Sequence, residues 1–290
     1  MNGSYLKVDH QTPKTIKDAC SLLSKHGGKA KIMAGGTDLL VSLKNRTLAP
    51  GYIIDIKALP KLSYINDDGK GLKIGAMTTI HEIETSPVIQ EKFPVLAQSA
   101  RQIGSPQVRY MATIGGNICR AAPSADMAPA LIGLGATAKI AGLGGQRTVP
   151  IEEFFCGPGE CVLKGDEIVT EFQVPNQPPY TVGIYLKWTP KVIITIAVIG
   201  VAAVLSLDAA GTTITDAKIV LGAVAPTPVR ATKAENILRG QVISDQLIDE
   251  AAQAAAKEAK PISDIRSPAN YRKKMVKELT AQAIRQVTGA

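Results

Sequence analysis

Two glycine pairs with short polar neighbours are the residues of this chain best suited to bind a charged ligand. They lie in the segments Lys31-Ile32-Met33-Ala34-Gly35-Gly36-Thr37-Asp38 and Thr113-Ile114-Gly115-Gly116-Asn117. A Gly-Gly pair lets the backbone adopt a positive φ and approach a ligand closely, and successive N–H groups of such a turn can point at one anion. Two converging turns suit the pyrophosphate of a dinucleotide, whereas two ordinary β-turns are the plainer explanation. Neither segment has the G-x-G-x-x-G spacing, so a Rossmann domain is not predicted.

The composition is that of an ordinary globular protein. The chain has 290 residues, of which 45% are hydrophobic and 20% charged, enough for one large domain or two to three small ones. Only 4% are aromatic, which argues against stacking on single-stranded nucleic acid. The net charge of +8 comes from dispersed basic residues, apart from Arg272-Lys273-Lys274. We therefore expect a solvated face, or a docking face for an acidic partner, and no nucleic-acid binding.

The sequence also indicates a cytoplasmic location. Residues 1–14 lack the apolar region of a signal peptide, and four cysteines are too few for a disulfide framework in a chain of this length. The apolar run 192–207 is shorter than the ~20 residues that span a membrane and carries Thr195, Gly200 and Ser206. We expect a buried strand or helix there and no membrane span.

Hydrophobic periodicity and turn residues divide the chain into alternating helices and strands. Helices are predicted at 15–25, 79–84, 95–103, 125–133, 247–259 and 270–287. Strands are predicted at 29–33, 52–56, 72–75, 137–141, 146–149, 167–174, 184–188, 193–207 and 218–225. A Gly/Pro loop falls at 154–159 and a linker at 175–179. We expect an α+β protein: a nucleotide-binding part at 1–177, in two lobes of about 1–58 and 59–177, and an antiparallel sheet with helices at 178–290.

Eight short blocks, in order, resemble one known family. The similarity is to the FAD-binding medium subunit of the molybdenum hydroxylases, a group that includes the flavin domain of xanthine dehydrogenase and the flavoprotein subunits of carbon monoxide and nicotinate dehydrogenases. The resemblance implies a two-lobed PCMH-type FAD-binding fold, with FAD extended between two α/β lobes and the third domain beside its isoalloxazine ring. The blocks are residues 34–38, 74–80, 103–109, 113–117, 122–126, 154–159, 166–169 and 269–272.

The resemblance also implies the cofactor-binding residues. Segments 31–38 and 113–117 would hold the pyrophosphate and ribityl region, and Asp126 would contact the cofactor. Ile103 would lie against the adenine, and a strand at Ile168 and Val169 would pack against the flavin. Read without the family, Asp126 caps the following helix and the three apolar residues are ordinary core.

A further match, at Tyr185-Leu186-Lys187, resembles an aromatic-x-Lys segment at the flavin ring. Lys187 would then stabilise an anionic reduced flavin electrostatically, and Tyr185 would cover a face of the ring. The alternative is an alternating strand with a solvated lysine. The resemblance assigns no catalytic residue and no metal ligand to this chain.

The chain departs from the family pattern in three places. Segment 189–195 lacks the acidic residue that relatives often carry after the aromatic-x-Lys segment, which leaves the electron acceptor open among NAD, oxygen, quinone and ferredoxin. The inserted four-cysteine loop of the 4-hydroxybenzoyl-CoA reductases is missing, so no extra iron–sulfur cluster is expected. Cys156 and Cys161 flank a Gly-Pro-Gly loop as free thiols or, less commonly in the cytosol, a reversible disulfide, and the role of Cys119 is open.

The resulting hypothesis is an electron-transfer flavoprotein subunit. FAD on this chain would receive electrons from two [2Fe–2S] clusters on a small subunit, and a large subunit with a molybdenum cofactor would act on the substrate. A dimer of such heterotrimers is expected. The first alternative is a stand-alone flavin oxidase or dehydrogenase of the wider two-lobed FAD superfamily. The second is a non-enzymatic basic binding module with glycine-rich turns.

Overall fold

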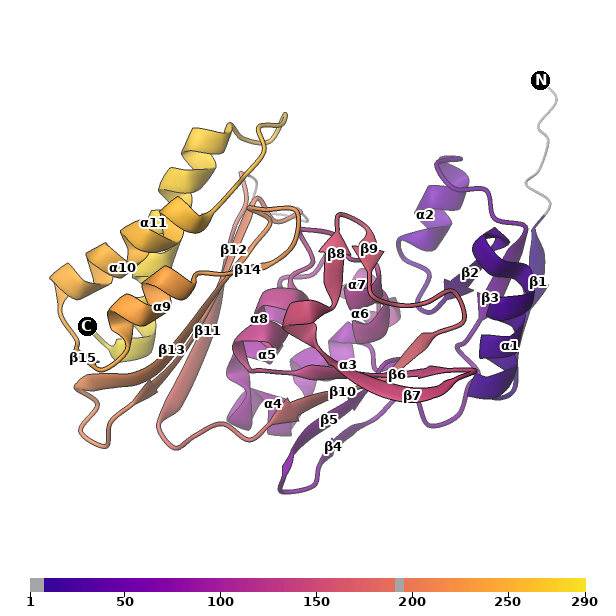
Figure 1. Ribbon diagram of the computed structural model, residues 1–290, viewed down its shortest axis with the longest axis horizontal. Helices are drawn as coiled ribbons and strands as arrows, with labels where there is room; N and C mark the ends of the chain where they lie inside the picture. The colour runs from indigo at the N-terminus through magenta and orange to yellow at the C-terminus, as the bar shows by residue number, and fades with distance from the viewer. Residues whose placement is uncertain (1–7, 191–195) are drawn as a thin grey trace.

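The computed structural model describes residues 8–190 and 196–290. Three sheets of three or more strands follow one another along the chain and stand side by side in Figure 1, from right to left. The first is a parallel sheet in the order β1-β3-β2, made of Asp9–Gln11, Tyr52–Asp55 and Ala30–Met33. Helix α1 (Ile16–His26) begins at Thr15, whose side chain caps it, and buries Ala19, Cys20 and Leu23. A short 3-10 turn, η1 (Gly27–Lys29), leads into β2. After β2 the first glycine pair leads into a short helix, α2 (Leu39–Lys44).

The second sheet is antiparallel, in the order β4-β5-β10-β6-β7. Its strands are Ile65–Asp67, Gly71–Gly75, Ile168–Pro175, Thr137–Gly142 and Gly145–Pro150. Six helices lie between β5 and β6 in the chain: α3 (Ile80–Thr85), α4 (Pro87–Lys92), α5 (Pro94–Arg101), α6 (Pro106–Met111), α7 (Ile114–Cys119) and α8 (Met127–Gly133). Proline at the first position starts α4, α5 and α6, where the missing N–H costs no hydrogen bond. These helices and the sheet share one apolar core.

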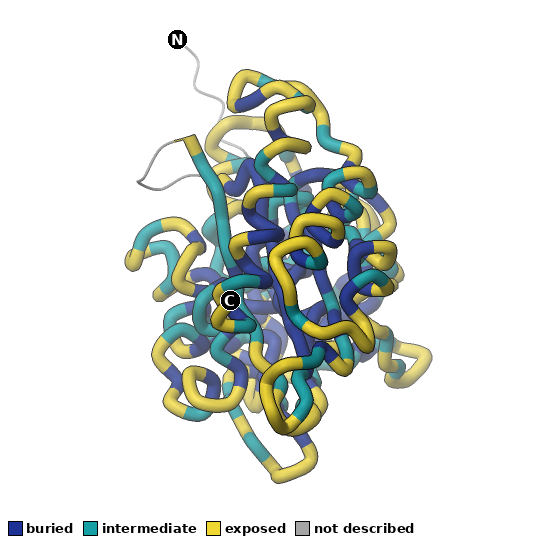
Figure 2. Tube along the Cα trace, turned by 90° about the vertical axis from the view of Figure 1, so that its left-hand side faces the viewer, coloured by how far each residue is buried: buried dark blue, intermediate teal, exposed yellow. Residues whose placement is uncertain are grey.

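The third sheet is also antiparallel and carries the carboxy-terminal helices. It contains β11 (Thr181–Trp188), β12 (Ile199–Leu207), β13 (Thr213–Gly222) and β14 (Val229–Arg230), with β15 (Gln241–Val242) beside β13. Helices α9 (Thr232–Leu238), α10 (Asp245–Glu258) and α11 (Ala269–Thr288) cover one face, and α5 and α8 pack on the other. Because both faces are covered, β12 is buried along nearly its whole length, which explains its almost uninterrupted apolar sequence. Figure 2 shows the buried segments running through the middle of the molecule.

The structure corrects four local predictions. The expected strand at 193–207 begins at Ile199 within the described residues, and 193–195 lie outside them. The strand expected at 218–225 runs from Thr213 to Gly222, because Ala223 adopts a positive φ of 62° that ends it. The predicted loop 154–159 follows a 3-10 turn, η2 (Ile151–Glu153), and contains β8 (Phe155–Gly157), which pairs with β9 (Glu160–Cys161).

The fourth correction concerns the second glycine segment, which is the first turn of helix α7 and not a β-turn. Thr113 caps this helix by accepting a hydrogen bond from the Gly116 N–H. Along the described ranges 8–190 and 196–290, no helix is both long and apolar enough to cross a membrane.

Candidate cofactor-binding site

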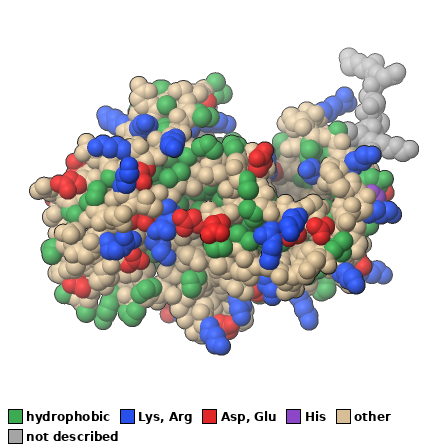
Figure 3. Space-filling model, viewed as in Figure 1, with side chains coloured by type: hydrophobic (Ala, Val, Ile, Leu, Met, Phe, Trp, Pro, Cys, Tyr) green, Lys and Arg blue, Asp and Glu red, His purple; other side chains and the backbone are tan. Residues whose placement is uncertain are grey.

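A cleft of about 700 Å³ lies where the first glycine loop and α2 face α6, α7 and the start of β10. Figure 3 shows the surface hollowed beside the projecting part of the molecule that carries α2. Most residues predicted from the sequence line this cleft: Lys31, Ile32, Ala34, Gly35, Gly36, Thr37, Asp38, Ile103, Thr113, Gly115, Gly116, Asn117, Ile168 and Val169. Five predicted residues lie outside its lining: Met33, Ile114, Asp126, Tyr185 and Lys187.

The first glycine pair fixes a loop that lies directly on the end of α6. A Cβ atom at Gly35 would stand 1.8 Å from the carbonyl oxygen of Met111, so no larger residue fits without moving backbone. Gly36 adopts a positive φ of 75°, which glycine tolerates best. Within the described part of the chain, the N–H groups of residues 34–38 have no hydrogen-bond acceptor. This loop therefore offers a run of unpaired amides at the cleft, as an anion-binding loop requires.

The second glycine segment offers a different group, because its amides are already occupied. The N–H groups of Ile114 and Gly115 donate to the carbonyls of Thr78 and Ala76, at 3.0 and 2.8 Å. Those of Gly116 and Asn117 donate to the side chain and the carbonyl of Thr113, at 3.1 and 2.9 Å.

The group that remains available in this segment is the side chain of Asn117. Its Oδ1 is buried and accepts no hydrogen bond from the described residues. A buried acceptor left unpaired costs roughly 1–3 kcal/mol, so a bound ligand with a donor at this point would be stabilised.

Charged side chains frame the mouth of the cleft. Arg120, directly after α7, and Asp38 on the first loop form an ion pair at 3.6 Å, and both are largely exposed. The pair therefore adds little stability and can separate when a ligand binds. Lys31 and Lys164 also line the cleft.

Glu167 is buried and receives hydrogen bonds from Arg147 at 2.7 and 2.8 Å. The Arg147 side chain holds the pKa of Glu167 at about 2 against the opposing effect of burial, so this cleft residue is a carboxylate at neutral pH.

The inner wall of the cleft is apolar. Ile103, Ile168 and Val169 are buried among the core side chains and also line the cleft. The backbone of Ile103 is fixed by Arg109, whose Nη1 donates to the Ile103 carbonyl at 3.1 Å and whose Nε donates to the carboxylate of Glu84 at 2.6 Å. A flat aromatic group could lie against this wall, as either end of a dinucleotide cofactor requires.

Asp126, Tyr185 and Lys187 form a buried network behind this wall. Tyr185 donates to Asp126 at 2.8 Å, and Lys187 donates to the other carboxylate oxygen at 3.1 Å and to the carbonyl of Gln102 at 2.8 Å. Burial raises the pKa of Asp126, and the charge of Lys187 opposes that rise. The side chain of Lys187 is only 5% exposed, so the alternative of a solvated lysine is wrong. Asp126 occupies the N-cap position of α8, but its side chain makes no capping hydrogen bond.

The cleft also includes residues that the motifs did not reveal. Ser42, Thr47 and Leu48 enter it from α2 and the segment after it, and Lys164 and Gly165 enter it just before β10. Arg120 could have been suspected as the first cation after the second glycine pair. The others carry no local signal, because only the packing of distant segments brings them to the cleft.

The four cysteines, all within the described residues, are free. Cys119 lines the cleft, and burial raises the pKa of its thiol. The part of the chain that the structure describes contains no group of three or more His, Cys, Asp or Glu residues able to hold a metal ion.

Both halves of this chain match known protein families. Residues 6–177 match the family described as the FAD binding domain in molybdopterin dehydrogenase, and residues 191–287 match the CO dehydrogenase flavoprotein C-terminal domain. The carbon monoxide dehydrogenase medium chain of Hydrogenophaga pseudoflava is 34% identical over 278 residues, covering 96% of each chain. The glyceraldehyde dehydrogenase medium chain of Sulfolobus acidocaldarius is 35% identical over 284 residues, covering 98% of each.

Solved structures agree with these sequence matches. A carbon monoxide dehydrogenase from Hydrogenophaga pseudoflava superimposes with a TM-score of 0.92 over 96% of both chains. The predicted fold class, the FAD cofactor and the assignment as an oxidoreductase component are thereby confirmed. The chain belongs to the FAD-binding medium-chain subunits of the molybdenum hydroxylase family.

Proposed function

We propose that this chain receives electrons from the [2Fe–2S] clusters of a small subunit and passes them through FAD to an external acceptor. The observation that carries this proposal is the cleft between the first glycine loop and α7, with its unpaired amides and the unpaired Oδ1 of Asn117. FAD, when bound, supplies the capacity to store two electrons and to release them. The residues of this chain bind the cofactor, orient it and set the polarity around it.

The cofactor-binding residues follow from the two kinds of group in the cleft. The amides of the first loop, together with Thr37 and Lys31, suit the negatively charged pyrophosphate. Asn117 suits a hydroxyl or N–H donor of the cofactor, since its free atom is an acceptor. Ile103, Ile168 and Val169 offer apolar contact to a ring.

Asp126, Tyr185 and Lys187 are assigned to the flavin end of the site. Their network lies directly behind Ile103, because Lys187 binds the carbonyl of the preceding residue, Gln102. The ammonium group of Lys187, which Asp126 holds in place, would favour a reduced anionic flavin at this end of the site.

The partners are proposed from the relatives. Those relatives are named medium chains of carbon monoxide and glyceraldehyde dehydrogenases, and a medium chain implies a small and a large companion. We assign two [2Fe–2S] clusters to the small subunit, the molybdenum cofactor to the large one, and a dimer of heterotrimers to the assembly. We divide the chain into an FAD-binding part at 1–177, with lobes at about 1–58 and 59–177, and a flavoprotein domain at 178–290. The cytoplasmic location expected from the sequence stays a prediction.

Titration with FAD tests the site. The cofactor-free chain should bind one FAD without a covalent bond, and Asn117→Ala should raise the dissociation constant by about 5- to 100-fold, the equivalent of one buried hydrogen bond. Quenching of flavin fluorescence reports the binding, and Asn66→Ala, an exposed asparagine on β4, is the control. Unchanged affinity in Asn117→Ala would remove this residue from the site. A chain that binds no FAD at all would overturn the proposal.

A further inference from the structure

Two isoleucines stand out from the surface on the connection between α10 and α11. In this connection, residues 259–268, Ile265 is fully exposed at 102% and Ile262 is 67% exposed. Single apolar side chains on a surface are common and need no explanation. These two differ because the backbone that carries them is tightly held.

Hydrogen bonds to the Asp264 carboxylate fix the conformation of this connection. Its Oδ1 accepts hydrogen bonds from the Arg266 N–H at 2.8 Å and from Arg272 Nη2 at 2.7 Å, and its Oδ2 accepts one from Arg266 Nη1 at 3.0 Å. Asp264 and Ser267 also exchange backbone hydrogen bonds at 3.2 Å. The Lys260 N–H, at the start of the connection, donates to the carbonyl of Val224 at 2.8 Å. Because the backbone of this connection is already fixed, it loses little backbone conformational entropy when a partner binds the two isoleucines.

The apolar surface continues beyond the connection. Tyr271, 42% exposed, packs against Trp188 at the end of β11, with 5.3 Å between the ring centroids and 57° between the ring planes. The N–H of Val198 bonds the Trp188 carbonyl, which brings the exposed Ile196 near the same strand end. We call the four residues Ile196, Ile262, Ile265 and Tyr271 the isoleucine face.

Exposed basic residues, called here the basic rim, lie in and next to the α10–α11 connection. Lys260, Arg266, Lys273 and Lys274 are exposed within or beside it. The nearby carboxylate, Asp264, is engaged by Arg266 and by Arg272, whose side chain is only 4% exposed. In Figure 3 basic side chains gather on the upper left of the molecule, where Figure 1 shows the start of α11. A matching surface would therefore be apolar at its centre and acidic at its edge.

Hydrogen bonds connect this face to the segment that precedes α8. Arg272 donates from Nη1 to the carbonyl of Ala223 at 3.4 Å, and the Ala223 N–H donates to the carbonyl of Pro123 at 2.8 Å. Pro123 lies between α7, which lines the cleft, and Asp126. In Figure 1 the α10–α11 connection and α2, beside the cleft, project toward the same side of the molecule. A partner seated on this connection would therefore lie on the side of the molecule toward which α2 projects.

We propose that the isoleucine face docks the electron-donating iron–sulfur subunit, through an apolar pocket on that subunit rimmed by carboxylates; this rests on the function proposed above. Of the proposed partners, the electron donor is the one that must lie close to FAD. A second copy of this chain fits poorly, since its face would bring a like basic rim against this one.

Purification of the complex through a tag on this chain, from cells that make all its subunits, tests the proposal. The wild-type preparation should contain an iron–sulfur chain in equal amount, measured by mass spectrometry and iron content. The double variant I262D/I265D should keep its FAD and its melting temperature and lose iron by about tenfold or more, as expected when two central apolar anchors are removed. Val242→Asp is the matched control, because Val242 is also 67% exposed but lies on β15, away from the face.

A charge-reversal pair tests the rim separately. K260E/K273E/K274E should lose the iron–sulfur chain, and K14E/K17E/K25E, with the same charge change on and before α1, should keep it. Normal retention of the iron–sulfur chain by I262D/I265D would overturn the docking proposal while leaving the proposed function intact. A wild-type preparation without any iron–sulfur chain would instead overturn the proposed function. A tagged chain that forms dimers which I262D/I265D dissociates would assign the face to a second copy and refute the proposal.

Discussion

At the level of single residues, the cleft presents two different kinds of unpaired group. The first glycine loop leaves its backbone amides unpaired, whereas the second segment uses its amides in helix α7 and leaves the side chain of Asn117 unpaired. Similar Gly-Gly sequences therefore serve different purposes. The difference arises because Thr113 caps α7 and the carbonyls of Ala76 and Thr78 lie opposite its first amides.

Glu167 gives a prediction at this scale that depends on pH. Its pKa in the folded protein is about 2, below the ordinary value of 4.5. A depressed pKa stabilises the fold above the ordinary value, and this stability is lost as pH falls from 4.5 toward 2. Glu167→Gln should thus lower the free energy of unfolding at pH 7 by about 1–3 kcal/mol.

Urea unfolding at pH 7, 4 and 3 measures this effect. The difference between wild type and Glu167→Gln should shrink steadily as the pH falls. The exposed Glu91→Gln serves as control. A difference that stays constant with pH would show that packing, and not the charge of Glu167, causes the loss.

At the level of elements, the conformation of the first glycine loop depends on its close contact with the end of α6. Gly35→Ala would place a methyl group on the backbone of Met111, with Cβ 1.8 Å from its carbonyl oxygen. The loop or α6 must then move, and we expect a loss of stability of about 1–3 kcal/mol, as for overpacking, together with weaker FAD binding. Gly28→Ala is the control, since a Cβ there meets nothing within 4 Å. Thermal unfolding and FAD titration of both variants test this, and equal behaviour would contradict the packing described.

Local sequence patterns predicted most elements but not how they combine. Helices α1, α8, α10 and α11 carry clear amphipathic or small-residue patterns and lie close to their predicted positions. Helix α7 was missed because its glycines disfavour a helix and only Thr113 and the packing of Ala76 favour one. The pairing of Asp126 with Tyr185 and Lys187 joins residues about sixty positions apart, and no local pattern reports it.

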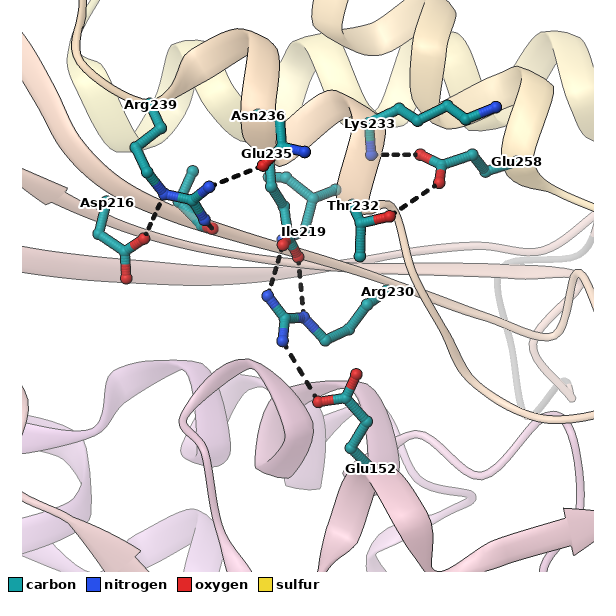
Figure 4. A network of polar contacts seen from close by, with 11 residues as sticks. Glu152, Asp216, Ile219, Arg230, Thr232, Lys233, Glu235, Asn236, Arg239 and Glu258 are labelled. Carbon is teal, nitrogen blue, oxygen red and sulfur yellow. Dashed lines mark hydrogen bonds and ion pairs between the residues drawn. The ribbon is translucent and has the colours of Figure 1, made fainter.

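At the scale of the whole molecule, the three larger sheets contribute to different parts of the candidate site. The cleft lies between the first two, and the third brings Tyr185 and Lys187 to Asp126 behind its wall. Figure 4 shows a second connection between the parts, in which Arg230 on β14 binds Glu235 on α9 and reaches Glu152 at 3.3 Å, in the turn after β7. The carboxy-terminal part is thereby connected to the preceding part of the chain at two places, Asp126 and Glu152.

One measurement tests the transfer of electrons into this chain most directly. The FAD-loaded chain is mixed, without oxygen, with its chemically reduced iron–sulfur subunit, and the absorbance of oxidised flavin and of the clusters is followed together. We predict that the flavin absorbance disappears as the clusters are reoxidised, and that the Asn117→Ala chain, depleted of FAD, leaves the clusters reduced. Clusters that stay reduced beside an oxidised, fully loaded wild-type chain would contradict the role assigned to it.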